Sequence, residues 1–197
     1  MLRHDPSEPR FTYGDYVRWS GDERWELIDG EAFAMSPAPS RRHQEAMVGL
    51  VAQIAPQLPG GPCRVYVAPF DVRLPRGAEA DAEVDTVVQP DIAVICDPAK
   101  LDAAGCRGAP DWIIEVLSPA TAARDRLQKR DLYKRHGVAE YWVLDPDGRR
   151  LTIHRLDAST GRYAAPTTAK AEGTASPRAV PGVSIDWSLV FASDEPF

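Results

Sequence analysis

The sequence has few cysteines, no long apolar run and no excess of positive charge. Its three cysteines, Cys63, Cys96 and Cys106, are odd in number and form no CxxC pair, so we expect neither a disulfide framework nor a zinc knuckle. No apolar stretch approaches the roughly 20 residues that span a membrane. Residues 1–10 are polar and lack a signal-peptide core. We therefore expect a disordered leader on a soluble, reduced protein of the cytoplasm, without a membrane partner.

The acidic balance excludes one class of nucleic-acid-binding protein. The net charge is −6, from 29 acidic and 23 basic side chains among 197 residues. Such a chain does not coat nucleic acid through a uniformly basic surface, although a local basic strip beside an acidic site is compatible with it. Its length suffices for one well-filled core.

The order of the expected elements predicts an α/β domain with a mixed sheet. Asp-Gly between two apolar runs predicts a hairpin at 25–35. Ser40 is a suitable N-cap for a helix that follows it, and Gly137 is a suitable residue just past the end of a helix from about residue 120. The remaining expectations are a short helix over 13–19, strands over 63–67, 70–74, 140–145 and 151–156, a loop over 164–179 and a last strand over 183–187.

Two short β-branched runs, 87–96 and 111–118, are the centre of the sequence. Each reads as a buried strand and carries one carboxylate among apolar neighbours, Asp91 in the first and Glu115 in the second. If the strands pair antiparallel around the loop 97–109, Asp91 lies directly opposite Glu115, with Cβ atoms about 5 Å apart. Two buried carboxylates in that position need a cation, a shared proton or a basic partner, and a divalent metal is the strongest answer.

The helix expected after Glu115 separates its charged residues onto two arcs. Asp125, Lys129, Leu132, Tyr133 and His136 share the arc whose apolar members should face the sheet. A lysine there is costly unless it finds carboxylates, and Glu115 and Asp91 are the candidates. The other basic residues either hold a nucleic-acid backbone or form a solvated helix face; they are Arg124, Arg126, Arg130, Lys134 and Arg135.

Other polar residues are ambiguous from the sequence. His43 lies on the apolar stripe of the helix after Ser40, so it is either a core histidine or a residue of the active pocket. Glu45 points almost the opposite way, toward solvent. Asp71 reads as the polar face of an edge strand.

Several motifs together resemble the Uma2 family. They lie in the same order along the chain: Trp25–Glu31, Met35–Pro37 with His43 after it, Pro69–Leu74, Val88–Ile92, Gly108–Pro119, Asp125 with Lys129 and Tyr133, and Gly137–Pro146. The resemblance implies the restriction-endonuclease-like, PD-(D/E)XK fold over residues 11–190, with an N-terminal β-hairpin, a mixed sheet flanked by helices, and a tail at 191–197. Pro90-Asp91 matches the PD of that motif.

The resemblance also implies a chemistry. The parent superfamily has a catalytic lysine two residues after the second carboxylate, where this chain has Leu117, and the matching lysine is Lys129 on the following helix. Asp91, Glu115 and the Val116 carbonyl would then bind Mg²⁺ or Mn²⁺, since these are hard oxygen ligands. Lys129 would orient a water or stabilise the transition state, and His43 would line the same pocket. The implied reaction is metal-assisted hydrolysis of phosphodiester bonds in nucleic acid, most simply DNA, by a homodimer.

Two alternatives remain open at this point. The chain is a catalytically inactive nucleic-acid-binding or interaction module that retains the nuclease fold, or Asp91, Lys129 and Glu115 form a buried salt-bridge network without metal. Metal titration separates the second alternative from the enzyme, and cleavage assays separate the first.

Overall fold

The computed structural model describes residues 10–21, 23–35, 40–118 and 124–192, with the side chains of 124–126 excepted. Its helices are α1 (Tyr13–Tyr16), α2 (Arg41–Ile54), α3 (Arg130–His136) and α4 (Trp187–Val190), with a π-helical segment, η4 (Arg124–Lys129), leading into α3. Short 3₁₀ turns are η1 (Ala55–Gln57), η2 (Asp81–Glu83) and η3 (Pro98–Lys100). The strands are β1 (Trp25–Ile28), β2 (Glu31–Ala34), β3 (Arg64–Val67), β4 (Val72–Arg73), β5 (Val87–Val88), β6 (Ile92–Ile95), β7 (Leu101–Asp102), β8 (Gly105–Arg107), β9 (Trp112–Val116), β10 (Glu140–Asp145), β11 (Arg150–Asp157), β12 (Arg162–Tyr163), β13 (Thr167–Lys170), β14 (Thr174–Ala175) and β15 (Ile185–Asp186).

The strands confirm the predicted α/β class and its mixed pairing, but they divide between two main sheets. The larger sheet has the order β12-β11-β10-β9-β6-β3, and β13 also pairs with β11. Its β9 and β10 run parallel, while its other pairs are antiparallel. The second sheet has the order β2-β1-β5-β4-β8-β7, and β14 pairs with β15. The N-terminal hairpin therefore belongs to the second sheet.

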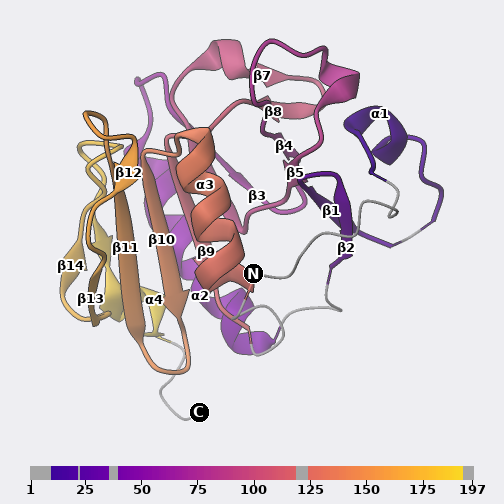
Figure 1. Cartoon of the computed structure of the whole chain (residues 1–197). Coiled ribbons are helices and arrows are strands. Elements are labelled where there is room, and N and C mark those ends of the chain that lie inside the picture. The colour runs from indigo at the N-terminus through magenta and orange to yellow at the C-terminus, as the bar shows by residue number, and fades with distance from the viewer. Residues whose placement is uncertain (1–9, 22, 36–39, 119–123, 193–197) are drawn as a thin grey trace.

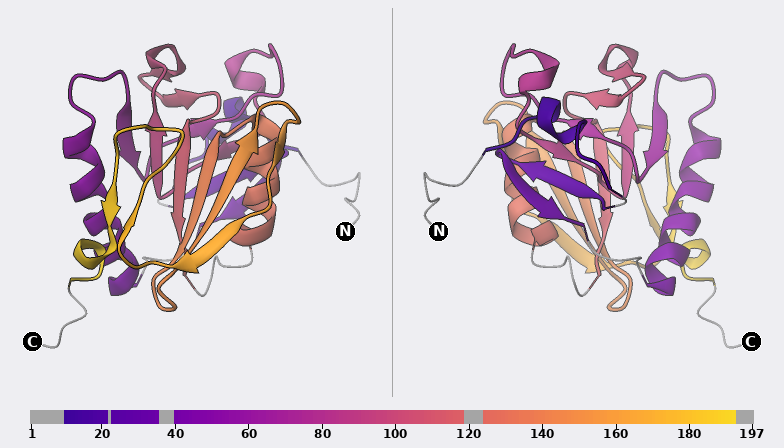
Figure 2. Two further views of the ribbon diagram at one scale, coloured as in Figure 1. Left: turned by 90° about the vertical axis from the view of Figure 1, so that its left-hand side faces the viewer. Right: turned by 90° about the vertical axis from the view of Figure 1, so that its right-hand side faces the viewer.

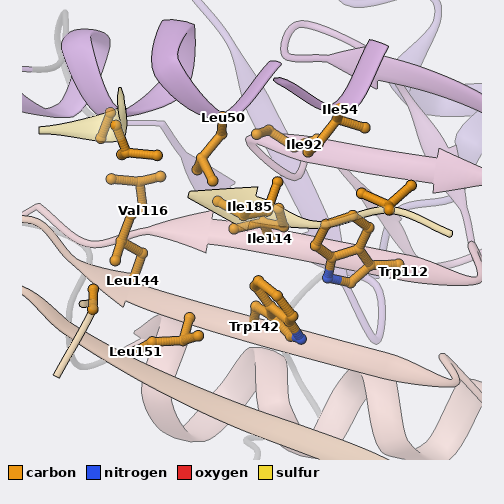
Figure 3. Close-up of a cluster of buried hydrophobic side chains, with 14 of the residues drawn as sticks. Leu50, Ile54, Ile92, Trp112, Ile114, Val116, Trp142, Leu144, Leu151 and Ile185 are labelled. Carbon is orange, nitrogen blue, oxygen red and sulfur yellow. The ribbon is translucent and has the colours of Figure 1, made fainter. Parts of the chain in front are cut away.

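Helices cover both faces of the larger sheet (Figure 1 and Figure 2), with α2 on one side and α3 on the other. The face toward α2 buries alternate residues of β6 and β9, such as Ile92 and Ile114, against Leu50 and Ile54 (Figure 3). The opposite face buries the residues between them, including Ile113, against Leu132 and Tyr133 of α3. Alternate side chains of a strand point to opposite faces, which is why an unbroken apolar run suits a strand covered on both sides.

The register between β6 and β9 agrees with the sequence prediction. Ile92 pairs with Ile114 and Val94 with Trp112. The ladder ends at the Ile92–Ile114 pair, so Asp91 and Glu115 stand directly beyond its end, each one residue from a paired residue. The predicted hairpin is also confirmed, since β1 and β2 pair around Asp29 and Gly30, whose φ angles of 54° and 81° are those of a primed turn. Ser40 caps α2 as expected, because its hydroxyl accepts a hydrogen bond from the His43 backbone N–H.

Some local predictions were wrong. The expected loop over 164–179 contains β13 and β14, because β11 offers β13 an open edge to pair with. Asp71 directly precedes β4, which lies between β5 and β8 and is therefore not an edge strand. The first helix ends at Tyr16 rather than at residue 19, and the last strand is two residues long and is followed by α4. The expected leader falls almost wholly outside the described residues, as does most of the tail and the first turn of the helix after Glu115.

The cysteine prediction also needs correction. Cys63 and Cys96 form a disulfide, and Cys106 is a buried free thiol. Arg64 pairs with Ile95 in the β3–β6 ladder, so the next step of the register brings the two cysteines face to face. A separation of 33 residues hides this pairing from spacing rules. None of the described helices has the length and apolar character needed to cross a membrane.

Candidate active site

Glu115 is the buried carboxylate at the centre of the candidate site. It lies on β9 beneath α3, and its side chain is only 4% exposed. Its Oε1 accepts hydrogen bonds from the Lys129 ammonium and from the Tyr133 hydroxyl, both at 2.8 Å. Burial and the nearby carboxylates of Glu115 and Glu26 raise the pKa of Tyr133 well above its usual value. Tyr133 is therefore a neutral donor that fixes the carboxylate.

Lys129 reaches the sheet as the helical arc predicted. Its side chain is 5% exposed, and its Nζ lies 2.8 Å from Glu115 Oε1 and 3.0 Å from Glu26 Oε1. The second partner differs from the expectation, which was Asp91. The buried network of the alternative interpretation is thus present in part, with Glu26 in the place expected for Asp91.

Glu26 is the site residue that the sequence reading missed. It lies on β1 of the second sheet, about 90 residues before Glu115, and is 1% exposed. Its Oε1 also accepts a hydrogen bond from the Gln89 backbone N–H at 3.0 Å. The sequence does carry a signal for this residue. Glu26 stands between Trp25 and Leu27 in a strand, just as Asp91 and Glu115 stand among apolar neighbours.

Asp91 and His43 form the more accessible half of the site. Asp91 Oδ2 accepts a hydrogen bond from the Val116 backbone N–H at 2.8 Å and lies 3.2 Å from His43 Nε2. The Asp91 side chain is 20% exposed and that of His43 is 8% exposed. His43 is therefore both buried on α2 and in contact with a predicted site residue. Its Nδ1 is buried and has no hydrogen-bond partner among the described residues.

Gln89 stands two residues before Asp91 and is held by several polar groups of the second sheet and of the segments next to it. Its Nε2 donates to Asp71 Oδ1 at 2.8 Å and to the Tyr16 hydroxyl at 3.1 Å, while its Oε1 accepts from Arg24 Nε at 3.0 Å. With its backbone N–H on Glu26, this side chain fixes the start of the segment that carries Asp91. Asp71 therefore supports the site through Gln89, a role that its interpretation as an edge-strand residue did not suggest.

The basic residues predicted to hold nucleic acid lie on and before α3. Arg130 and Lys134 are each 36% exposed and pair with Asp131 at 3.1 and 3.0 Å. Arg135 turns instead to Asp29 at the tip of the hairpin. The side chains of Arg124 and Arg126 lie outside the described residues.

The donor set fits a hard divalent cation that keeps part of its water shell. No three His, Cys, Asp or Glu side chains gather as a ready metal cage in the described part of the chain. Mg²⁺ does not need one, because one or two carboxylates and several waters commonly complete its six positions. Both hydrogen bonds described for the Asp91 side chain reach Oδ2, which leaves Oδ1 for such an ion.

Comparisons with known proteins bear on the family and the fold. The family model Uma2, described as "Putative restriction endonuclease", matches residues 13–188. A Synechocystis protein described as "Uncharacterized" is 28% identical over 148 residues, which are 73% of this chain and 74% of the relative. A crystal structure from Anabaena variabilis, titled as that of "a putative nuclease belonging to DUF820", superposes with a TM-score of 0.71 at 18% identity and covers 92% of this chain and 98% of that one. The last likeness shows a shared fold.

Proposed function

The chain belongs to the Uma2 family, and on that premise we propose that it is a metal-dependent endonuclease that hydrolyses phosphodiester bonds in DNA. One observation carries the proposal: Lys129, although it is not two residues after Glu115, contacts that carboxylate at 2.8 Å, and the backbone N–H of the next residue, Val116, donates to Asp91. The family description as restriction endonucleases supports DNA as the substrate.

Each residue has a role that its contacts support. Asp91, Glu115 and the Val116 carbonyl would hold Mg²⁺ or Mn²⁺, which when bound supplies an activated water and neutralises charge developing on the phosphate. Tyr133 and the Val116 N–H hold the two carboxylates in place. Lys129 carries the proton-donating ammonium beside Glu115, where it orients water or stabilises the charged transition state.

Two further groups complete the proposal. His43 Nε2 lies against Asp91 Oδ2 and orients that carboxylate from α2. Arg130 and Lys134, with Arg124 and Arg126 before them, would hold the phosphate backbone by charge. The homodimer and the cytoplasmic location expected from the sequence stay predictions, and sedimentation of the purified protein checks the first.

The metal part of the proposal is tested by thermal unfolding. Mn²⁺ should raise the melting temperature, because the ion binds only the folded arrangement of Asp91 and Glu115; at a hundredfold excess over Kd the gain is about 2.7 kcal/mol. Asp91→Asn should abolish the shift. Asp147→Asn is the matched control, since Asp147 is 66% exposed and pairs only loosely with Arg42 at 3.3 Å.

The outcomes separate the three interpretations. Equal Mn²⁺ stabilisation of the wild type and Asp91→Asn would contradict the site. A metal shift without cleavage of plasmid, linear or single-stranded DNA would favour the binding module. Absence of both would leave Glu26, Lys129 and Glu115 as a structural network.

A further inference from the structure

A cavity of about 300 Å³ opens on the same face of the larger sheet as Glu115, beside α3. We call it the β11 cavity. It is lined by Val143, Asp145, Arg150, Thr152, His154 and Thr168, with Leu117 at its border. None of these residues has a part in the function proposed above.

The strand register connects this cavity to the candidate active site. Glu115 pairs with Val143, Val143 with Thr152, and Thr152 with Thr168, so the four form one row across β9, β10, β11 and β13. Adjacent strands lie about 4.8 Å apart, which places Thr152, one of the lining residues, about 10 Å from Glu115. In Figure 1 these strands lie next to one another, with α3 over β9 and β10. A nucleic-acid strand with its phosphate at Glu115 would thus bring a neighbouring nucleotide to the cavity.

The lining is suited to the edge of a nucleobase rather than to a phosphate. Asp145 and Arg150 are register partners, so an acceptor and a donor stand side by side at the rim, and the carboxylate disfavours an anion. The hydroxyls of Thr152 and Thr168 lie 3.1 Å apart. One hydroxyl donates to the other, which leaves one O–H for a ligand. Bases present donors and acceptors on one edge, and arginine and carboxylate side chains are among their usual partners.

His154 adds a neutral polar group on an apolar floor. Its ring lies between those of Tyr141 and Tyr163, at 5.6 Å from each, so its orientation is fixed. Burial lowers its pKa to about 4, which keeps the ring uncharged at neutral pH. Leu117 and Val143 supply apolar contact for a flat ring. A volume of about 300 Å³ is at the lower end of the range of small-molecule sites, which suits one base with part of its sugar.

We propose that the β11 cavity is a subsite that takes one unstacked nucleobase of the nucleic acid bound at Glu115. The inference rests on the proposed function for the position of the strand. It adds a substrate feature, namely that one base next to the bound phosphate leaves its stack. Removing a base from its stack costs a few kcal/mol, which the contacts in the cavity would offset.

The test blocks the cavity from an exposed position. Thr168 and its neighbour Thr167 are both exposed on β13, but they point to opposite faces of the sheet, because Thr168 pairs with Thr152 and Thr167 with Ile153. Thr168→Trp should fill the cavity, and Thr167→Trp is the matched control. Thr152→Val, which removes a hydroxyl while keeping the side-chain shape, is the second variant.

The probes are fluorescein-labelled DNA 20-mers, single-stranded and duplex, each intact or with one abasic position, and binding is measured in EDTA so that no cleavage occurs. With the wild type, one abasic position should weaken binding about tenfold, the scale of one lost base contact. Thr168→Trp should bind the intact probe about tenfold more weakly and no longer respond to that abasic position. Thr152→Val should lose about threefold, and Thr167→Trp should behave as the wild type.

Each outcome bears on the inference separately from the nuclease activity. Thr168→Trp binding like Thr167→Trp, or an abasic loss that persists in Thr168→Trp, would overturn the subsite even if the protein cleaves DNA in Mg²⁺. The predicted binding pattern without any cleavage would support the subsite and contradict the proposed nuclease. Absence of DNA binding by the wild type would overturn the subsite as well.

Discussion

Lys129 and Arg73 are both buried cations that contact two carboxylates, but the carboxylates lie in different surroundings. Around Arg73, which is 1% exposed, Asp81 and Asp102 are 40% and 48% exposed. Burial opposes the charge of Arg73, yet the hydrogen bonds that Arg73 donates to Asp102 and Asp81 outweigh it and raise its pKa. Around Lys129 both partners are buried, Glu26 at 1% and Glu115 at 4%.

This difference distinguishes an ion-pair cluster with a structural role from one that belongs to a functional site. The Arg73 cluster joins β4 to η2, which carries Asp81, and to β7, which carries Asp102, and water still solvates its carboxylates. The Lys129 cluster takes all three charges out of water, which is expensive and is often no more stable than apolar residues of similar volume. Buried, closely spaced ionisable groups are typical of functional sites, and this one adjoins the partly exposed Asp91.

The largest expected effect is on stability without metal. Lys129→Met should lower the free energy of unfolding by about 3–5 kcal/mol, because it leaves the carboxylates of Glu26 and Glu115 buried without the ammonium that lies between them. Arg73→Met should cost about 1–3 kcal/mol, since Asp81 and Asp102 stay hydrated and mainly hydrogen bonds are lost. Urea unfolding in EDTA measures both.

Mn²⁺ sharpens this comparison. It should recover part of the loss in Lys129→Met, because a divalent ion offsets the excess negative charge, and should add no more to Arg73→Met than to the wild type. Equal losses for the two variants, with equal metal response, would mean that the two clusters have the same structural role.

The next effect is on catalysis. Lys129→Ala should leave metal binding intact or tighter, yet slow cleavage by about a hundredfold or more, roughly 2.7–4 kcal/mol, the scale for loss of one transition-state donor. Arg73→Met should retain the cleavage rate per folded molecule. Single-turnover cleavage in Mg²⁺ and Mn²⁺ is the measurement. A Lys129→Ala variant that cleaves at the wild-type rate would show that the helix lysine is not the superfamily lysine.

Much of the fold near the site could be predicted because local signals agree with the tertiary structure there. The runs containing Asp91 and Glu115 are apolar and short, and the strands that they form pair antiparallel around the loop between them, as expected. The arc of Lys129 and Tyr133 follows from helical spacing alone. The N-cap at Ser40 and the turn at Asp29-Gly30 depend on the chemistry of those residues themselves, so the local sequence predicts them.

The predictions that failed concern contacts between segments that are distant in the sequence. Glu26 meets Lys129 only because the hairpin packs beside α3, and no spacing rule links the two. Cys63 meets Cys96 through the β3–β6 register. Arg73 alternates as a polar strand residue should, and its burial arises from the turns that fold over it. The division of the strands into two sheets is likewise a matter of long-range pairing.

His154 is a third buried basic side chain, and its pKa shows how strongly burial disfavours a positive charge in this molecule. Two tyrosine rings contact His154, and burial, with a smaller contribution from the Arg130 charge that Asp131 partly offsets, lowers its pKa to about 4 from 6.5. The unfolded chain binds a proton near pH 6.5 and the folded chain only near 4. The contribution of His154 to stability should therefore be constant above pH 6.5, fall by about 2–3 kcal/mol as the pH drops to 4, and level off below that. Denaturant unfolding against pH should show a shallower fall in His154→Phe; an unchanged slope would contradict the assignment.

The smallest effect should come from Lys134, whose charge is shared with the solvent rather than with buried acids. Its side chain is 36% exposed and pairs with Asp131 at 3.0 Å on the solvent side of α3, so losing it should cost less than about 1 kcal/mol of stability. Lys134→Ala should weaken DNA binding modestly and lower the slope of log K against log salt by about 1, because one phosphate contact releases one counterion. Arg18→Ala is the matched control, since Arg18, just after α1, is 74% exposed and its removal changes the net charge equally. Binding titrations from low to high salt decide the matter: identical slopes for the two variants would show that the α3 charges form an ordinary solvated face, and that DNA reaches the Lys129 cluster by another surface.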